Sequence, residues 1–314
     1  MRVKGNASGS TTLLRTAKER FADIPEDSHP LQAVRGSLNV SEALNSVQNE
    51  DLNVAIIQLR SWSPLRPNNP STMELIVVVN AQTQLAKVLR YQGHFEEALE
   101  HLEKLLHEAT IPQSLFEDIR TDIANELGIV LIEMHRPNEA REILQSEIDT
   151  RIRKRSTDTA ASKLLHLSIA ETLMRQGEIE EANDHYLRLS NLGPFADLCR
   201  SVGLARVAHS RLEWSVAIER WTDALKILAT HFPRGNSHSG YTSLGILKSM
   251  HAALSKSGHI TLSKSEHKEL MHKTLEQVGN IEATCAAHGC KHWVPGLNSY
   301  WMDSISGSVA RQPT

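Results

Sequence analysis

The chain has 314 residues, a formal net charge of −3 and only 4% aromatic residues. So few aromatic side chains favour closely packed helices over an aromatic-rich β-sandwich, and the interspersed acids and bases argue against a general attraction to nucleic acid or to an acidic membrane. The longest aliphatic run, residues 75–79, is far shorter than the roughly 20 residues that cross a bilayer.

Residues 1–30 are polar and begin rich in Gly, Ser and Thr, so they are predicted to form a disordered N-terminal tail, with room for a short helix over 12–21. Four basic residues precede the first acid: Arg2, Lys4, Arg15 and Lys18. A mitochondrial presequence has the same character and stays open as the alternative. The three cysteines are too few for a disulfide framework and favour a reducing compartment, so we expect a cytoplasmic protein, with the nucleus as a second location.

Residues 31–70 are predicted to contain a helical pair over 38–61 and a proline-rich linker over 63–70. The linker separates this pair from the more regular segment that follows. We interpret the pair as an N-terminal cap, or as a worn copy of the repeat that comes after it.

Residues 71–233 contain one helix-pair pattern four times. Each copy has an anchor alanine near the start of its second helix, and the anchors are spaced by 42, 42 and 35 residues: Ala98, Ala140, Ala182 and Ala217. A small residue lies 12 positions before each anchor: Ala86, Gly128, Ala170 and Ala205. A bulky residue lies four positions after it: Leu102, Leu144, Tyr186 and Trp221. One such pair cannot bury its own apolar stripe, so successive pairs are predicted to stack.

The residue types at the turns agree with this layout. Small residues let two helices approach closely. Gly93 and Gly177 are expected to end a first helix in the left-handed conformation, and Pro137 fits the first turn of a second helix. Two Ser-x-x-Glu sequences have the capping-box spacing expected just before a first helix: Ser71 with Glu74, and Ser114 with Glu117.

The grid of residues over 71–233 resembles the tetratricopeptide repeat family. Its 42-residue spacing is longer than the usual 34 and is similar to the repeats of kinesin light chains and of fungal or bacterial signalling arrays. The large aromatic residue common near the start of the first helix is replaced in every copy: Gln82, Ala124, His166 and Ser201. The resemblance implies an all-α, right-handed superhelical solenoid.

Residues 234–303 are predicted to form C-terminal capping helices, near 241–256 and 263–288, because a terminal repeat needs a polar outer face. Residues 304–314 are predicted to be a disordered tail. Together with the N-terminal segments, these stretches enclose the four repeats on both sides.

The resemblance also implies that the first helices line a concave groove in which partners bind. Ten polar residues are placed on that face, opposite the packing stripe, and are expected to be exposed: Asn80, Lys87, Arg90, Asp122, Asn125, Glu133, Glu171, Arg175, Arg206 and His209. Amide side chains can hold a peptide backbone, and basic side chains can hold carboxylates. Four apolar residues are expected to add contacts: Ile129, Ile132, Leu167 and Met174. The alternative is a solvated polar face that binds nothing.

Other chemistry has weaker support. The basic clamp that some family members use for chaperone tails is not expected, because Thr83, Lys87 and Leu164 stand at its positions. Four zinc-ligand types lie close together near the C-terminus: Cys285, His288, Cys290 and His292. Four ligands within eight residues can hardly surround one tetrahedral ion, so a helix end is favoured over a metal site there. Cys199 is predicted to be a core residue rather than a nucleophile.

The sequence therefore predicts a non-catalytic scaffold or adaptor that binds a peptide or a partner helix, with no cofactor and no nucleic-acid or membrane partner. Two alternatives remain. One is a metal-dependent enzyme or regulator that uses residues 285–292. The other is a helical-repeat RNA binder, against which the lack of basic stripes argues.

Overall fold

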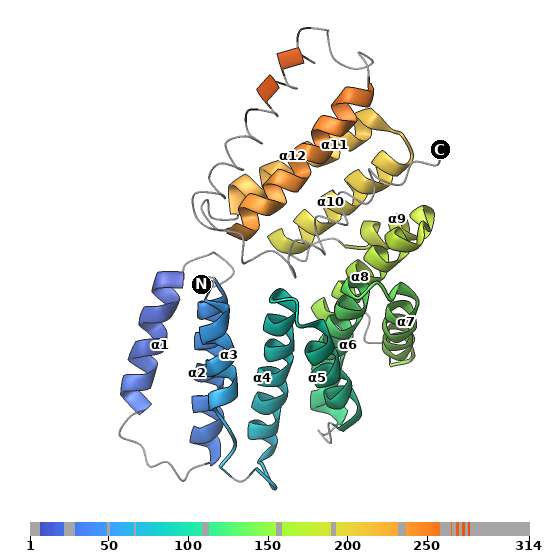
Figure 1. Ribbon diagram of the computed structural model, residues 1–314. Coiled ribbons are helices and arrows are strands. Elements are labelled where there is room, and N and C mark those ends of the chain that lie inside the picture. The colour runs from blue at the N-terminus through green and yellow to red at the C-terminus, as the bar shows by residue number, and fades with distance from the viewer. Residues whose placement is uncertain are drawn as a thin grey trace. The chain divides into compact units, whose positions relative to one another are not determined.

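The computed structural model describes residues 7–21, 29–48, 51–65, 67–108, 113–154, 159–189, 193–231 and 237–257, with six single positions between 265 and 276. The regular structure of these residues is α-helical throughout, and twelve helices follow one another along the described chain (Figure 1). The prediction of an all-α repeat fold is confirmed. Within the described residues, the helices are all too short or too polar to cross a membrane.

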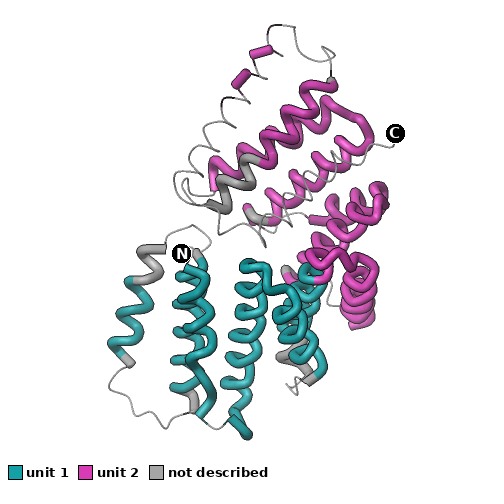
Figure 2. The backbone as a smooth tube through the Cα atoms, in the orientation of Figure 1, with its two compact units in different colours: residues 1–130 teal, residues 131–314 magenta. Residues whose placement is uncertain are grey.

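The chain forms two compact units, residues 1–130 and 131–314 (Figure 2). The helices of unit 1 are α1 (Ala7–Phe21), α2 (His29–Gln48), α3 (Leu52–Ser61), α4 (Thr72–Tyr91), α5 (Phe95–Glu108) and most of α6 (Gln113–Glu133). Each helix from α1 to α4 packs on the next, and α2 also contacts α4. The first helix begins at Ala7, earlier than the helix expected over 12–21.

The helices of unit 2 are α7 (Pro137–Arg153), α8 (Ala160–Gln176), α9 (Ile179–Leu187), α10 (Pro194–Ser210), α11 (Trp214–His231) and α12 (Ser237–Ser257). Helix α8 contacts α7, α9 and α10, and α10, α11 and α12 pack in succession. Helix α12 includes the capping helix expected over 241–256. The second one, expected over 263–288, lies almost wholly outside the described residues.

The residue grid found in the sequence is the core of the stacked pairs. All four anchor alanines are completely buried, and so are the four bulky residues that follow them, from Leu102 to Trp221. A buried side chain of that size contributes about 1.5–3 kcal/mol through removal of its surface from water. The spacing that repeats along the chain is therefore the spacing of its buried contacts.

Helices α2 and α3 follow the same grid and make a fifth pair. Ala55 on α3 is fully buried, Ala43 lies 12 positions before it, and Leu59 lies four positions after it. Both of these residues are also buried. Polar contacts repeat as well: Gln92 donates to Asn53, and Gln176 donates to Asn138, where each asparagine lies two positions before its anchor. Of the two interpretations of this segment, the buried residues favour a repeat.

The turns within the pairs share one backbone conformation. Gly93 and Gly177 adopt positive φ angles of 82° and 83°, which confirms their expected left-handed conformation. His135 and Leu212 adopt it too, with φ of 59° and 61°. All four residues lie five positions before an anchor alanine. The turn geometry is therefore fixed by the repeat, even where the residue is not glycine.

The start of α4 has the predicted capping box. The Glu74 backbone N–H donates to Ser71 Oγ at 3.3 Å, and the Ser71 backbone N–H donates to the Glu74 carboxylate at 2.9 Å. Pro137 occupies the first turn of α7, as predicted. The second predicted box is wrong, because α6 begins at Gln113 and so includes Ser114 rather than following it.

Candidate functional site

The ten polar residues predicted for the groove lie on the first helices α4, α6, α8 and α10, and they differ in exposure. Asn80 and Asp122 are exposed, whereas Lys87, Asn125 and Arg175 are half-buried. The other five are buried, against expectation: Arg90, Glu133, Glu171, Arg206 and His209. The expectation considered each helix pair alone, but the neighbouring helices cover these positions as well.

Four of the predicted groove residues pair with a charge on a neighbouring first helix, two in unit 1 and two in unit 2. In unit 1, Lys87 Nζ on α4 lies 2.8 Å from Glu126 Oε1 on α6, and an Arg90 guanidinium nitrogen lies 3.5 Å from Glu126 Oε2. The Arg90 guanidinium also lies 4.7 Å from the centre of the Tyr91 ring. Glu126, which the sequence analysis did not single out, thus joins α4 to α6.

In unit 2 the equivalent contact is a buried triad. Glu171 on α8 and Arg206 on α10 each directly follow the small residue of their repeat, and an Arg206 nitrogen lies 2.7 Å from both Glu171 oxygens. The hydroxyl of Tyr186 on α9 donates to the same carboxylate. The triad therefore ties three helices together, and its two predicted groove residues are directed at each other.

These contacts leave the carboxylates charged. Burial alone would raise the pKa of Glu171, but the charge of Arg206 and the hydrogen bonds from Tyr186 and Arg206 hold that pKa below its usual value. Burial likewise opposes ionisation of Glu126, and the charges of Lys87 and Arg90 outweigh it, so its pKa is also lowered. A buried pair of this kind is costly to break, because the remaining partner is left as an isolated charge.

The apolar residues expected to add groove contacts are mostly core. Ile132, Leu167 and Met174 are buried, and Ile129 is half-buried. His209 is buried as well, with its ring edge-on to Trp214 at 5.1 Å between centroids. Cys199 is buried, which agrees with a core role, and burial raises the pKa of its thiol well above the usual value. A neutral, buried thiol is a poor nucleophile.

The accessible residues of unit 1 among those predicted form a strip on its first helices, which we call the open face: Asn80, Lys87, Asp122, Asn125 and Ile129. They come from α4 and α6, the helices that Glu126 joins. The face presents amides, one carboxylate and one aliphatic side chain, and the charge of Lys87 is matched by Glu126. It is therefore polar without a dominant charge.

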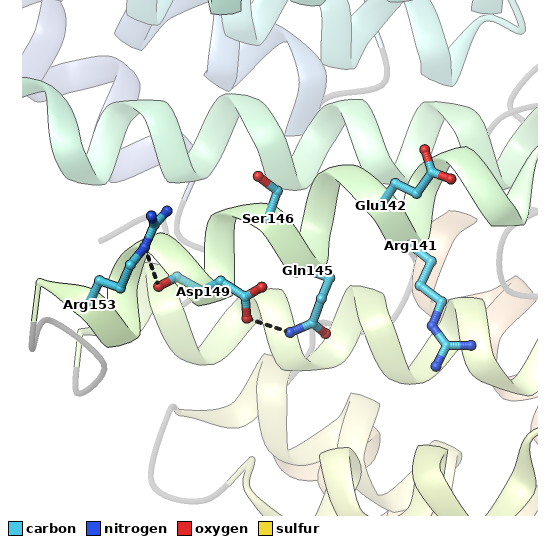
Figure 3. Close-up of a pocket in the computed structure, with 6 residues that line it drawn as sticks. All are labelled: Arg141, Glu142, Gln145, Ser146, Asp149 and Arg153. Carbon is cyan, nitrogen blue, oxygen red and sulfur yellow. Dashed lines mark hydrogen bonds between the residues drawn. The ribbon is translucent and has the colours of Figure 1, made fainter.

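Sequence reasoning missed two features of unit 2. A pocket of about 680 Å³ is lined by six residues of α7: Arg141, Glu142, Gln145, Ser146, Asp149 and Arg153. Figure 3 shows these side chains along a single helix, where Gln145 donates to Asp149 at 2.8 Å. The second feature is a contact between His166 and His185. The sequence contained a signal for this contact. His185 lies three positions after the anchor Ala182, and His166 lies four positions before the small residue Ala170 of the same repeat.

The described part of the chain holds no group of three or more His, Cys, Asp or Glu side chains placed to bind a metal ion. The weak candidates Cys285, His288, Cys290 and His292 all lie outside the described residues. The metal-dependent alternative therefore stays a prediction.

Comparison with known proteins identifies the repeat. Residues 78–107 match the family model of the tetratricopeptide repeat. The chain therefore carries a tetratricopeptide repeat over these residues. The matched segment covers most of α4 and nearly all of α5, including Ala86 and Ala98 of the grid. Repeats of this family are in general protein-interaction scaffolds.

Two solved structures are similar to this chain. The crystal structure of BtubC (BKLC) from P. vanneervenii is 14% identical, covers 84% of this chain and 93% of its own, and has a TM-score of 0.51. A structure from Podosopora anserina, described as a kinesin light chain with nearly identical TPR-like repeats, is 21% identical and covers 65% of this chain and 95% of its own, with a TM-score of 0.46. No curated protein matches the chain.

Proposed function

We propose that this tetratricopeptide repeat protein is a non-catalytic scaffold that holds a peptide or a partner helix in the concave groove of its solenoid. Of the predicted groove residues, those on the open face of unit 1 are the ones we propose to make the contact. The proposal rests on the general role of such repeats and on one observation, the accessibility of this strip. The equivalent residues Glu171, Arg206 and His209 of unit 2 are buried.

The chemistry of the open face suits an uncharged or mixed-charge segment. The Asn80 amide offers both donors and an acceptor, which matches the alternating N–H and C=O groups of a peptide backbone. Ile129 on α6 offers an apolar contact. Since α4 and α6 are already joined by the Lys87–Glu126 pair, little ordering would accompany binding.

The experiment is affinity capture from cell extract, followed by mass spectrometry, with the double variant Asn80→Arg, Asp122→Arg. Both residues are exposed, so two long cations should block the face while the fold stays intact. Charge reversal at Lys87 and Arg90 would be less informative, because it would leave Glu126 buried among like charges.

The matched control is Glu100→Arg with Glu103→Arg, on the exposed side of α5 in the same unit. We expect the control to capture the same proteins as the unmodified chain, and the open-face variant to lose at least one of them. Circular dichroism should show equal helicity in all three proteins. Identical capture by the open-face variant would refute this site.

A further inference from the structure

Two histidine side chains meet across the α8–α9 pair of unit 2. The Nδ1 atoms of His166 and His185 lie 2.9 Å apart, and the ring centroids are separated by 5.0 Å with a 44° tilt. Both side chains are half-buried, so solvent and small ions can reach them. The contact belongs neither to the open face nor to the buried triad.

At this distance the two nitrogens must share one proton. One Nδ1 carries hydrogen and donates, and the other accepts through its lone pair, which requires at least one neutral ring. Burial, with the charge of Arg188, lowers the pKa of both rings, and the neighbouring His166 helps to lower that of His185 to about 4. Near neutral pH both rings are therefore neutral, so protons compete little for the lone pairs.

Neutral imidazole nitrogens are the preferred protein ligands of several d-block cations. With metal–nitrogen bonds of about 2.0–2.1 Å, nitrogens 2.9 Å apart subtend an angle of about 90° at the metal. That is the angle between neighbouring ligands in a square-planar or tetragonal site, which Cu(II) and Ni(II) prefer. A tetrahedral ion would need the nitrogens about 3.3–3.4 Å apart.

We propose that His166 and His185 form a two-histidine site for Cu(II) or Ni(II). The ion takes the place of the shared proton, which moves through solvent to Nε2 of the same ring, so both rings stay neutral and water fills the other positions of the ion. The rings must rotate so that both lone pairs point at the ion, and rotation about the terminal χ angle of histidine is easy. The ion would then bridge α8 and α9.

The charged neighbours set the limits of this site. Arg188 is exposed at the end of α9 and, with Arg141, repels a cation, whereas the Asp184 carboxylate attracts it. Arg141 is partly neutralised, because its guanidinium lies 2.8 Å from Glu178 and 3.1 Å from Glu181. The balance indicates a site of moderate strength rather than a permanent structural one.

The test is titration of the full chain with Ni(II), followed by calorimetry, and with one equivalent of Cu(II), followed by electron paramagnetic resonance. All proteins carry Cys285→Ser, His288→Gln, Cys290→Ser and His292→Gln, which removes the other candidate ligands and avoids oxidation of the two thiols. We expect one Ni(II) equivalent to bind at least tenfold more weakly in His166→Gln and in His185→Gln. The control variant His101→Gln changes a half-buried histidine of α5, and it should leave the affinity for Ni(II) unchanged.

Circular dichroism and melting temperatures establish that the variants are folded. The Cu(II) spectrum of the unsubstituted pair gives an answer even if a variant unfolds. We expect hyperfine splitting of the Cu(II) resonance by two equatorial nitrogen ligands. Splitting by one nitrogen, or by none, overturns the proposal. Equal Ni(II) affinity in folded His166→Gln and His185→Gln proteins overturns it as well.

Discussion

The aromatic ring of Tyr186 lies directly against the backbone of Gly203. A Cβ atom at position 203 would come within 2.3–2.5 Å of three atoms of that ring, closer than real Cβ contacts allow. The ring has no room to withdraw, because it is fully buried and its hydroxyl is bound to Glu171. Glycine at this point lets α9 and α10 approach each other.

The variant Gly203→Ala should therefore lower the free energy of unfolding, by about 1–3 kcal/mol. The sign of this change is informative, because helix propensity alone would make alanine about 1 kcal/mol more favourable than glycine in a helix. Urea unfolding followed by circular dichroism measures the change. In a Tyr186→Leu background the loss should shrink, and an equal loss there would contradict the proposed clash.

Removal of one partner from the buried triad should be more damaging than removal of both. Arg206→Leu leaves the Glu171 carboxylate buried without its cation, and we expect a loss of about 3–5 kcal/mol. Replacing Glu171 with Leu as well should restore part of that stability. Denaturant midpoints of the two proteins decide the matter, and a double variant less stable than Arg206→Leu would contradict this prediction, because it would show that Glu171 stabilises the fold even without Arg206.

The histidine contact predicts a loss of stability in acid. The folded-state pKa values of His166 and His185 lie below the unfolded value of 6.5, that of His185 at about 4. Between pH 6.5 and pH 4 the unfolded chain binds more protons than the folded chain. The contribution of the two neutral histidines to the free energy of unfolding is therefore fully present above pH 6.5 and is lost as the pH falls towards 4. Across this pH range the melting temperature of His185→Gln should fall less steeply than that of the unmodified chain.

His209 has a lowered pKa for similar reasons, burial and then the charge of Lys256, and it acts in the same direction. A His209→Gln protein is therefore needed to separate the two effects. If the melting temperature falls with pH equally steeply in His185→Gln and in the unmodified chain, the contact between His166 and His185 does not cause the loss of stability in acid.

The left-handed turns offer a gain in stability. His135 and Leu212 hold positive φ angles that strain any side chain, and Leu212 is 59% exposed, so glycine would remove little buried surface there. His135→Gly and Leu212→Gly should each raise the free energy of unfolding by about 0.5–1 kcal/mol, after the added entropy of glycine in the unfolded chain. The reverse change, Gly177→Ala, should destabilise, and a stabilised Gly177→Ala would contradict this account.

The buried framework could be predicted from the sequence because it depends on local spacing. Residues 12 before and four after each anchor occupy fixed places on two helices, so Ala98 and Leu102 are as easily found as Ala182 and Tyr186. The left-handed turns could be predicted only where glycine marks them. His135 and Leu212 give no such signal, since their conformation is imposed by the stacked helices around them.

The candidate site was harder to predict, because exposure on a first helix depends on its neighbours. Arg90 and Arg206 have the right spacing for an exposed polar face, yet each is covered and paired with a carboxylate from a neighbouring first helix. The choice of partner requires knowledge of which helices lie side by side. Asn80 remains exposed, and nothing in its own sequence context distinguishes it from Arg90.

The shortening of the last anchor spacing from 42 to 35 falls after Tyr186, the bulky residue of the third repeat. The interval from the small residue to the bulky one is the same in every pair, whereas α9 has 9 residues and α7 has 17. The array can therefore change in length after the bulky residue of a pair, including in the last turns of its second helix, while the buried grid stays the same. Duplication of one complete period should lengthen the protein without disturbing its neighbours, whereas a short insertion within a module would rotate its apolar side chains out of the core.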